Sequence, residues 1–212
     1  MPDIKAAICK AGRRLYARGL ISAAEGNISV RNRHGDIWTT PVGVCKGFIT
    51  SGMLVKVNMN GDVISGHNKP SSELKMHLHT YKLRKDAGAL VHIHPVTATA
   101  YASAGIALDK PYLTENILAL GVVPIAPYAA PSTDEVPESL TPFIKDHNVI
   151  LMAHHGALCI GKTLDEAVLL AESLEAAAKT ALVMRFLGAE NITIPEEKIE
   201  QLKNLKKNMK KG

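Results

Sequence analysis

The stretch GALVHIHP, residues 88–95, decides the interpretation of the fold. Its apolar and β-branched residues predict a buried strand, which the proline at its end terminates. Side chains two positions apart project from the same face of a strand, so His92 and His94 are expected to point together at its carboxyl end. Two imidazoles in that arrangement can bind one metal ion.

A third imidazole is offered by the pair His154-His155, which ends another apolar run, NVILMA at residues 148–153. Neutral imidazoles are good ligands for zinc and related transition ions, and catalytic zinc sites typically take three protein ligands. Glu73, at the start of a predicted helix, is a candidate acidic partner. A His-x-His pair by itself is more often structural, but a second pair at a strand end favours metal binding.

The pair His77 and His79 has the same spacing but lies in a helical pattern. Two residues of a helix turn through about 200°, so these two rings are expected to diverge. Of the two His-x-His pairs, only the one in the strand is therefore expected to chelate one ion.

Outward from the central strand, the sequence predicts an α/β structure with a central sheet and helices on its faces. The Asn60-Gly61 hairpin signal and the capping box at 163–166 are strong local signals. The expected elements are a helix over 3–19, a strand–turn–strand unit over 21–43, a hairpin over 53–64, a helix from 70 to about 85, a short helix over 96–104, a strand near 122–126, a helix after 131–135, strands over 148–153 and 157–160, a helix from 163 to about 187, and a last helix from 195.

Length and charge bound the possible classes of protein. With 212 residues, of which 46% are hydrophobic and 21% charged, the chain is expected to fold as one domain over residues 1–212. The net charge of +5 is concentrated in residues 201–212, which hold five lysines and no acid. Removing these five from the 25 basic residues leaves 20, which balance the 20 acidic ones. A neutral body does not indicate a nucleic-acid surface.

Cysteines and hydropathy indicate the compartment. Three cysteines, none in a Cys-x-x-Cys pair, argue against a disulfide framework and against a cysteine zinc site. The first 20 residues lack a continuous apolar core, so no signal peptide is expected. No apolar stretch approaches the roughly 20 residues that cross a bilayer, so a cytoplasmic protein without a membrane partner is expected.

Three turns offer anion-binding groups. Ser71-Ser72 at a predicted helix N-terminus presents hydroxyls and backbone N–H groups, and Gly26-Asn27 permits a turn with exposed amides. Pro41-Val42-Gly43 predicts another tight turn after a strand. Each alone is best explained as an ordinary cap, turn or loop.

These motifs together resemble those of the class II aldolase/adducin family, and within it the L-fuculose-1-phosphate aldolases. The resemblance runs from about residue 5 to residue 190 and implies a three-layer α/β/α fold with a mostly antiparallel central sheet. It also implies a homotetramer with active sites near the subunit interfaces. The motifs, in chain order, are EGNIS (25–29), TPVG (40–43), KPSSE (69–73), VHIHP (91–95) and HHG (154–156).

The resemblance assigns roles residue by residue. It implies that Glu73 is a resting-state metal ligand and the catalytic acid/base. The ion it implies is Zn²⁺, or another divalent transition ion such as manganese or cobalt. The implied metal ligands besides Glu73 are His92, His94 and His155, and the implied phosphate-binding residues are Gly26, Asn27, Val42, Gly43, Ser71 and Ser72.

Three departures from the family pattern leave the sugar open. Val42 stands where the aldolase has a hydroxyl residue, so one phosphate contact is missing. Tyr112 falls near the place of the family's mid-chain catalytic tyrosine, with Glu115 as a rival for that role. No tyrosine follows Tyr128, although the aldolase has one in its C-terminal tail.

The implied activity is reversible cleavage of a ketose 1-phosphate, similar to L-fuculose 1-phosphate, into dihydroxyacetone phosphate and an aldehyde. The alternatives within the fold are an aldolase for 5-deoxyribulose or methylthioribulose 1-phosphate, a pentulose-phosphate 4-epimerase and a methylthioribulose-phosphate dehydratase. The adducin branch is a metal-free structural module, and the three histidines with Glu73 argue against it.

The basic C-terminal segment, residues 195–212, is a separate question. Ile199, Leu202 and Leu205 recur every three residues, which predicts an amphipathic helix with a lysine-rich face. We expect a solvent-exposed terminal helix, and in this family such a segment can also lie over the active site of a neighbouring subunit.

Overall fold

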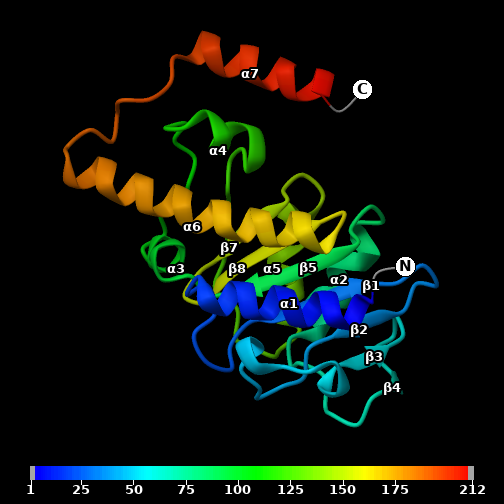
Figure 1. The fold of residues 1–212 in the computed structure, drawn as a ribbon. Coiled ribbons are helices and arrows are strands. Elements are labelled where there is room, and N and C mark those ends of the chain that lie inside the picture. Colours follow the sequence, from blue (N-terminus) through cyan, green and yellow to red (C-terminus); the bar gives the residue numbers. More distant parts are fainter. Residues whose placement is uncertain (1–2, 210–212) are drawn as a thin grey trace.

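The computed structural model describes residues 3–209, apart from the side chains of residues 203 and 205–209 (Figure 1). Its elements, in chain order, are α1 (Ile4–Ala17), β1 (Asn27–Arg31), β2 (Ile37–Thr39), the 3₁₀ helices η1 (Lys46–Phe48) and η2 (Ser51–Met53), β3 (Val55–Val57), β4 (Val63–Ser65), α2 (Leu74–Leu83), β5 (Ala89–Ile93), α3 (Val96–Ser103), α4 (Thr114–Ala119), β6 (Ile125–Ala126), α5 (Glu135–Ile144), β7 (Val149–Met152), β8 (Gly156–Gly161), α6 (Leu164–Phe186) and α7 (Glu196–Met209).

The strands form one eight-stranded sheet in the order β4-β3-β2-β1-β5-β8-β7-β6. All neighbouring strands are antiparallel except β6 and β7, which are parallel. The predicted mostly antiparallel central sheet is therefore confirmed. The strand with the two histidines, β5, lies between β1 and β8, so its end is flanked by chain on both sides.

Helices cover both faces of the sheet, as the α/β/α prediction requires. In Figure 1, α1 and α6 lie in front of the sheet, and α2 and α5 lie behind it. Alternation along β5 explains this layering, because Ala89, Val91 and Ile93 belong to the core under α1 and α6. Leu90 belongs instead to the second core, under α2 and α5.

Several element boundaries differ from the prediction. The helix expected from residue 70 begins at Leu74, because Ser71 and Ser72 form the turn before it, and it ends at Leu83. The strand expected over 122–126 is reduced to two residues, since Pro124 has no N–H for the ladder and takes part through its carbonyl, which accepts from Leu151 N.

The short helix α4 (Thr114–Ala119) was not predicted from the sequence. Its six residues are too few to show a helical period, and no side-chain hydrogen bond caps its start. Missing this helix matters because it carries Glu115 in its first turn.

The capping box at the start of α6 is confirmed in part: Thr163 Oγ1 accepts from Glu166 N at 3.2 Å, whereas Glu166 Oε2 accepts from Lys162 N. Beyond α6, the expected terminal helix is present as α7, which packs against α4 (Figure 1). The Leu205 side chain and residues 210–212 lie outside the described residues. Among the helices that the structure describes, none combines the length and the apolar character needed to span a bilayer.

Candidate active site

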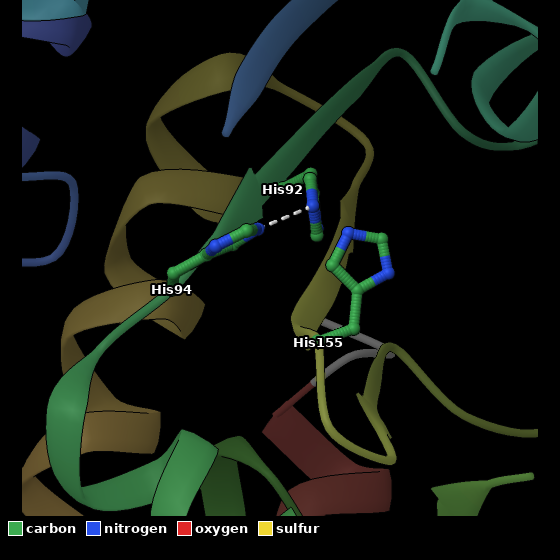
Figure 2. Close-up of side chains that lie close together, drawn as sticks. All are labelled: His92, His94 and His155. Atoms are coloured by element: carbon green, nitrogen blue, oxygen red, sulfur yellow. Dashed lines mark hydrogen bonds between the residues drawn. The ribbon is translucent and has the colours of Figure 1, made fainter. Parts of the chain in front are cut away.

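Three imidazoles converge at the end of β5. His92, His94 and His155, hereafter the three-histidine cluster, each offer one ring nitrogen, and these nitrogens all lie within 4.8 Å of one another. The Nε2 atoms of His92 and His94 are 2.9 Å apart (Figure 2). The structure thus brings together the pair predicted from the strand and the third histidine implied by the family resemblance.

Backbone contacts orient the rings. The Nδ1 atom of His92 lies 2.9 Å from the carbonyl oxygen of Ala157 on the neighbouring strand β8, so it carries the proton and donates it to that oxygen. The other nitrogen of His92, Nε2, therefore faces His94 Nε2 and the Glu73 carboxylate, where it is placed to bind a metal ion. A metal-binding histidine is commonly oriented by such a hydrogen bond from its other nitrogen.

The turn before β8 explains why His155, and not His154, joins the cluster. His154 has a φ of 56°, in the left-handed region, and its ring faces Tyr128 at 6.1 Å. The next residue, Gly156, cannot be larger, because a Cβ there would lie 2.4 Å from Ile93 O and 2.7 Å from His94 Cδ2. Absence of this side chain lets the His94 ring pack against the turn that carries His155.

Glu73 adds a carboxylate to the three imidazoles as a possible metal ligand. Its carboxylate lies 2.9 Å from His155 Nε2 and 3.2 Å from His92 Nε2, and its Oε2 accepts from Asn27 Nδ2 at 2.9 Å. Burial would raise the pKa of this carboxyl, but the two histidines outweigh burial and hold the pKa well below its usual range. Glu73 is therefore ionised beside the imidazoles.

This donor set fits a divalent transition ion. Burial and the neighbouring histidines lower the pKa of His94 to about 3, so its ring is neutral, as a metal ligand must be. Three imidazole nitrogens and one carboxylate are the ligands expected for zinc and similar ions. The three-histidine cluster can therefore hold a metal ion.

Two of the predicted phosphate turns lie side by side. An isolated bridge joins Pro41 to Pro70, Val42 N donates to Lys69 O at 3.1 Å, and Ser71 N donates to Thr40 O at 3.2 Å. These contacts hold the turn before α2 against the turn after β2. They also engage the Val42 and Ser71 amides, so an anion here depends on other groups of the two turns, such as the serine hydroxyls.

The third turn packs directly on the cluster. Gly26 has a φ of +67°, and a Cβ on it would lie 2.6 Å from His92 O. Both the backbone conformation and this close approach therefore require glycine. Asn27 follows, and its amide reaches Glu73. The three turns and the three-histidine cluster are therefore parts of one site.

A buried lysine beside this site was not predicted. Lys46 is 2% exposed, and its Nζ donates to the carbonyl of Ala24 in the loop before Gly26. Burial lowers the pKa of Lys46, while the nearby charges of Glu25 and Glu73 raise it. Nothing in the sequence distinguishes this lysine from an exposed one, because its burial follows from how η1 packs on α1.

Tyr112 and Glu115 lie in another part of the chain. The Tyr112 hydroxyl donates to Glu190 O at 2.8 Å, and burial raises its pKa. The tyrosine lines a cavity of about 680 Å³ beside α4 and α6, whereas Glu115 is exposed in the first turn of α4. Among the described residues, no hydrogen bond, ion pair or ring contact joins Tyr112 or Glu115 to the three-histidine cluster, so their catalytic roles remain predictions.

Comparisons with known proteins agree with this geometry. Residues 6–182 match the family model "Class II Aldolase and Adducin N-terminal domain". A 3-oxo-tetronate 4-phosphate decarboxylase of Pectobacterium atrosepticum is 32% identical over 198 residues, which cover 89% of this chain and 90% of that protein. A 5-deoxy-D-ribulose 1-phosphate aldolase of Bacillus thuringiensis serovar kurstaki is 33% identical, with 90% and 89% covered. A solved L-fuculose 1-phosphate aldolase superposes with a TM-score of 0.86 at 30% identity, covering 95% of each chain. The chain belongs to the class II aldolase and adducin family.

Proposed function

We propose that the protein is a zinc-dependent aldolase that reversibly cleaves a ketose 1-phosphate into dihydroxyacetone phosphate and an aldehyde. The observation that carries the proposal is the ionised Glu73 carboxylate, 2.9 Å and 3.2 Å from two of three converging imidazoles. Relatives whose names include L-fuculose 1-phosphate aldolase and 5-deoxy-D-ribulose 1-phosphate aldolase support this class of substrate.

The chain's own groups divide the substrate between them. The proposed phosphate-binding turns are Gly26-Asn27, Val42-Gly43 and Ser71-Ser72. The packing of Gly26 on His92 O and the hydrogen bonds between the other two turns support this assignment. His92, His94 and His155, with Glu73, would hold the ion. When bound, a divalent ion supplies Lewis acidity, which stabilises the negative charge of an enediolate.

Glu73 is the proposed acid/base at the enediolate carbon. When the C3–C4 bond breaks, its electron pair passes to C3 and forms the enediolate of dihydroxyacetone phosphate, and Glu73 delivers a proton to that carbon. The reverse step removes the same proton. Asn27, which donates to Glu73 Oε2, keeps the carboxylate aimed at the site between these events.

Aldol cleavage needs a second acid/base, to take the proton of the C4 hydroxyl. Either Tyr112 or Glu115 is proposed for this role, and among the described residues neither is hydrogen-bonded or ion-paired to the three-histidine cluster. Their participation therefore requires a homo-oligomer, proposed here as a tetramer, in which they approach the site of a neighbouring subunit.

The placement of Tyr112 also favours a second candidate, decarboxylation of a 3-oxo acid phosphate. There the bond from the α-carbon to the carboxylate breaks, CO₂ leaves, and the electron pair forms the same type of enediolate for Glu73 to protonate. This reaction has no C4 hydroxyl proton to remove, so it needs no second acid/base. The similarity to a 3-oxo-tetronate 4-phosphate decarboxylase supports this alternative.

The test of the shared step is proton exchange on dihydroxyacetone phosphate in deuterated water. The zinc-loaded protein is expected to exchange one proton stereospecifically, and the Glu73→Gln variant is expected to be slower by about 10²-fold or more. A fully metallated wild-type protein that exchanges no proton would contradict both candidates.

The second measurement separates the two candidates. The aldolase forms a ketose 1-phosphate when dihydroxyacetone phosphate is mixed with a small aldehyde, whereas the decarboxylase releases CO₂ from 3-oxo-tetronate 4-phosphate. CO₂ release without aldol addition would reject the aldolase and retain the role of Glu73.

A further inference from the structure

A buried polar seam joins α2 to β1 behind the candidate site. Glu73, His77 and Tyr81 are spaced by four residues and therefore lie on one face of α2 and the turn before it. Asn27 and Ser29 are spaced by two and share one face of β1. The two rows meet, since Asn27 contacts Glu73, and Ser29 contacts both His77 and Tyr81.

The inner part of the seam is closely hydrogen-bonded. His77 Nδ1 and Ser29 Oγ are 2.6 Å apart, Ser29 Oγ and Tyr81 OH are 2.9 Å apart, and Tyr81 OH donates to Ser29 O at 3.1 Å. All three residues are at most 1% exposed. Such an arrangement fixes both the rotation and the axial position of α2 against the sheet.

In the described chain, three atoms of the seam are buried without a hydrogen bond, and one of them, Glu73 Oε1, has His155 Nε2 as an ion-pair partner at 2.9 Å. Among the described residues, His77 Nε2 and Asn27 Oδ1 are buried and make no hydrogen bond. Burial lowers the pKa of His77 to about 3, so its ring is neutral and has one donor and one acceptor nitrogen. Tyr81 OH donates to Ser29 O, so Ser29 Oγ donates to Tyr81 OH and His77 Nδ1 donates to Ser29 Oγ. The lone pair of the neutral ring therefore lies on Nε2, and one water between Nε2 and Asn27 Oδ1 would donate to both.

We propose that His77 is a positioning residue for Glu73, acting through Asn27. One buried water that donates to both His77 Nε2 and Asn27 Oδ1 joins these two atoms. The amide is thereby oriented with Nδ2 toward Glu73 Oε2, where the 2.9 Å hydrogen bond is found. This role rests on the proposed function of Glu73 as acid/base.

A positioning role and a merely structural role differ in what they change. A structural seam would affect stability and leave the folded, metallated enzyme unaltered. A seam that orients the Asn27 amide controls where the Glu73 carboxylate points, and so affects both metal binding and the proton-transfer step. Loss of a residue that orients a metal ligand typically costs about 10- to 100-fold in metal affinity or activity.

The experiment uses His77→Leu and His77→Gln, the latter retaining a polar side chain that can bond to the buried water. The matched control is His79→Leu, because His79 lies two residues away on α2 and bonds instead to Thr141 on α5 at 2.8 Å. The readouts are the Co²⁺ dissociation constant and absorption spectrum, and the rate of proton exchange on dihydroxyacetone phosphate at full metal occupancy.

We expect His77→Leu to weaken Co²⁺ binding, change the Co²⁺ spectrum and slow exchange by about 10- to 100-fold, with His77→Gln recovering part of each effect. His79→Leu is expected to match the wild type. In a Glu73→Gln background, His77→Leu should add little further loss, because the two residues act as one unit.

Wild-type Co²⁺ binding and spectrum in a folded His77→Leu protein, or additive losses in the double variant, would overturn the proposal. If His77→Leu does not fold, His77→Gln and Ser29→Ala carry the same measurements and the same criteria. Failure of the wild-type protein to exchange protons would reject the proposed function instead, and the Co²⁺ measurements would still test His77, since they need no substrate.

Discussion

The three-histidine cluster and the cavity beside α4 and α6 differ in their walls and in their room. The cluster is crowded and polar, with His92 fully buried and a carboxylate within 3.2 Å of its ring. The cavity is roomy, at about 680 Å³, and is lined mainly by apolar side chains such as Ile106, Leu108 and Ile117. Of its two tyrosines, Tyr101 and Tyr112, the second is hydrogen-bonded to the backbone carbonyl of Glu190.

The large cavity and the candidate metal ligands thus belong to different regions of this molecule. Shifted pKa values and convergent imidazole nitrogens occur together at the cluster, where the His92 ring is held by a hydrogen bond to Ala157 O. The cavity has space for a guest, but its apolar walls offer little to stabilise a developing charge. The chemistry is therefore assigned to the crowded region.

His94→Ala is expected to have the largest effect and tests whether the three-histidine cluster carries the chemistry. Removing one imidazole should abolish stoichiometric metal binding, from roughly one ion per chain, and lower activity by at least about 10³-fold, because a Lewis acid is worth several kcal/mol. Elemental analysis and proton-exchange rates measure both effects. His154→Asn is the control, since this neighbouring ring faces Tyr128 and asparagine tolerates a positive φ. A metal-free protein with full activity would remove the cluster from the chemistry.

Gly156→Ala tests whether the crowding itself is required. The added methyl would lie 2.7 Å from the His94 ring and 2.4 Å from Ile93 O, so we expect a loss of about 1–3 kcal/mol in the free energy of unfolding and weaker metal binding. Chemical denaturation and metal titration give the two values. Gly52→Ala, with no atom within 4 Å of the new methyl, should change neither. Equal behaviour of the two variants would show that the turn before β8 relaxes freely.

Lys46→Met tests whether the buried lysine charge contributes to binding of the substrate phosphate. We expect the KM for a phosphorylated substrate to rise about tenfold, with little change in kcat. The reason is that the loop before Gly26 loses both the hydrogen bond from Lys46 to Ala24 O and the nearby positive charge. The free energy of unfolding should fall less than the loss of this hydrogen bond alone would suggest, because burying the lysine charge is itself costly. Lys56→Met, which removes an ion pair with Asp36, is the control. An unchanged KM would separate Lys46 from the phosphate turns.

The smallest expected effect is that of Tyr112→Phe. Loss of the hydrogen bond to Glu190 O should cost about 1 kcal/mol of stability and leave proton exchange on dihydroxyacetone phosphate unchanged. Thermal unfolding and exchange rates test this. Loss of exchange would place the tyrosine at the cluster after all. Loss of aldol cleavage alone would identify Tyr112 as the second acid/base.

The elements that carry the site could be predicted because local periodicity encodes them. Alternation in GALVHIHP places His92 and His94 on one face of a strand, and the helical spacing of His77 and His79 separates their rings. The structure confirms both, since the first pair meets at 2.9 Å, whereas His77 bonds to Ser29 and His79 to Thr141.

By itself the sequence determined the alternating strand, the hairpin, the long capped helix and, through its motifs, the family. Tertiary structure alone decided the features that depend on distant segments meeting. These are the opposite placements of the His155 and His154 rings, the burial of Lys46 and the hydrogen bond from Tyr112 to Glu190 O. Periodicity reports which face of an element a residue occupies, because neighbouring residues fix that face. What lies opposite is fixed by packing between elements far apart in the chain, and no local pattern records it.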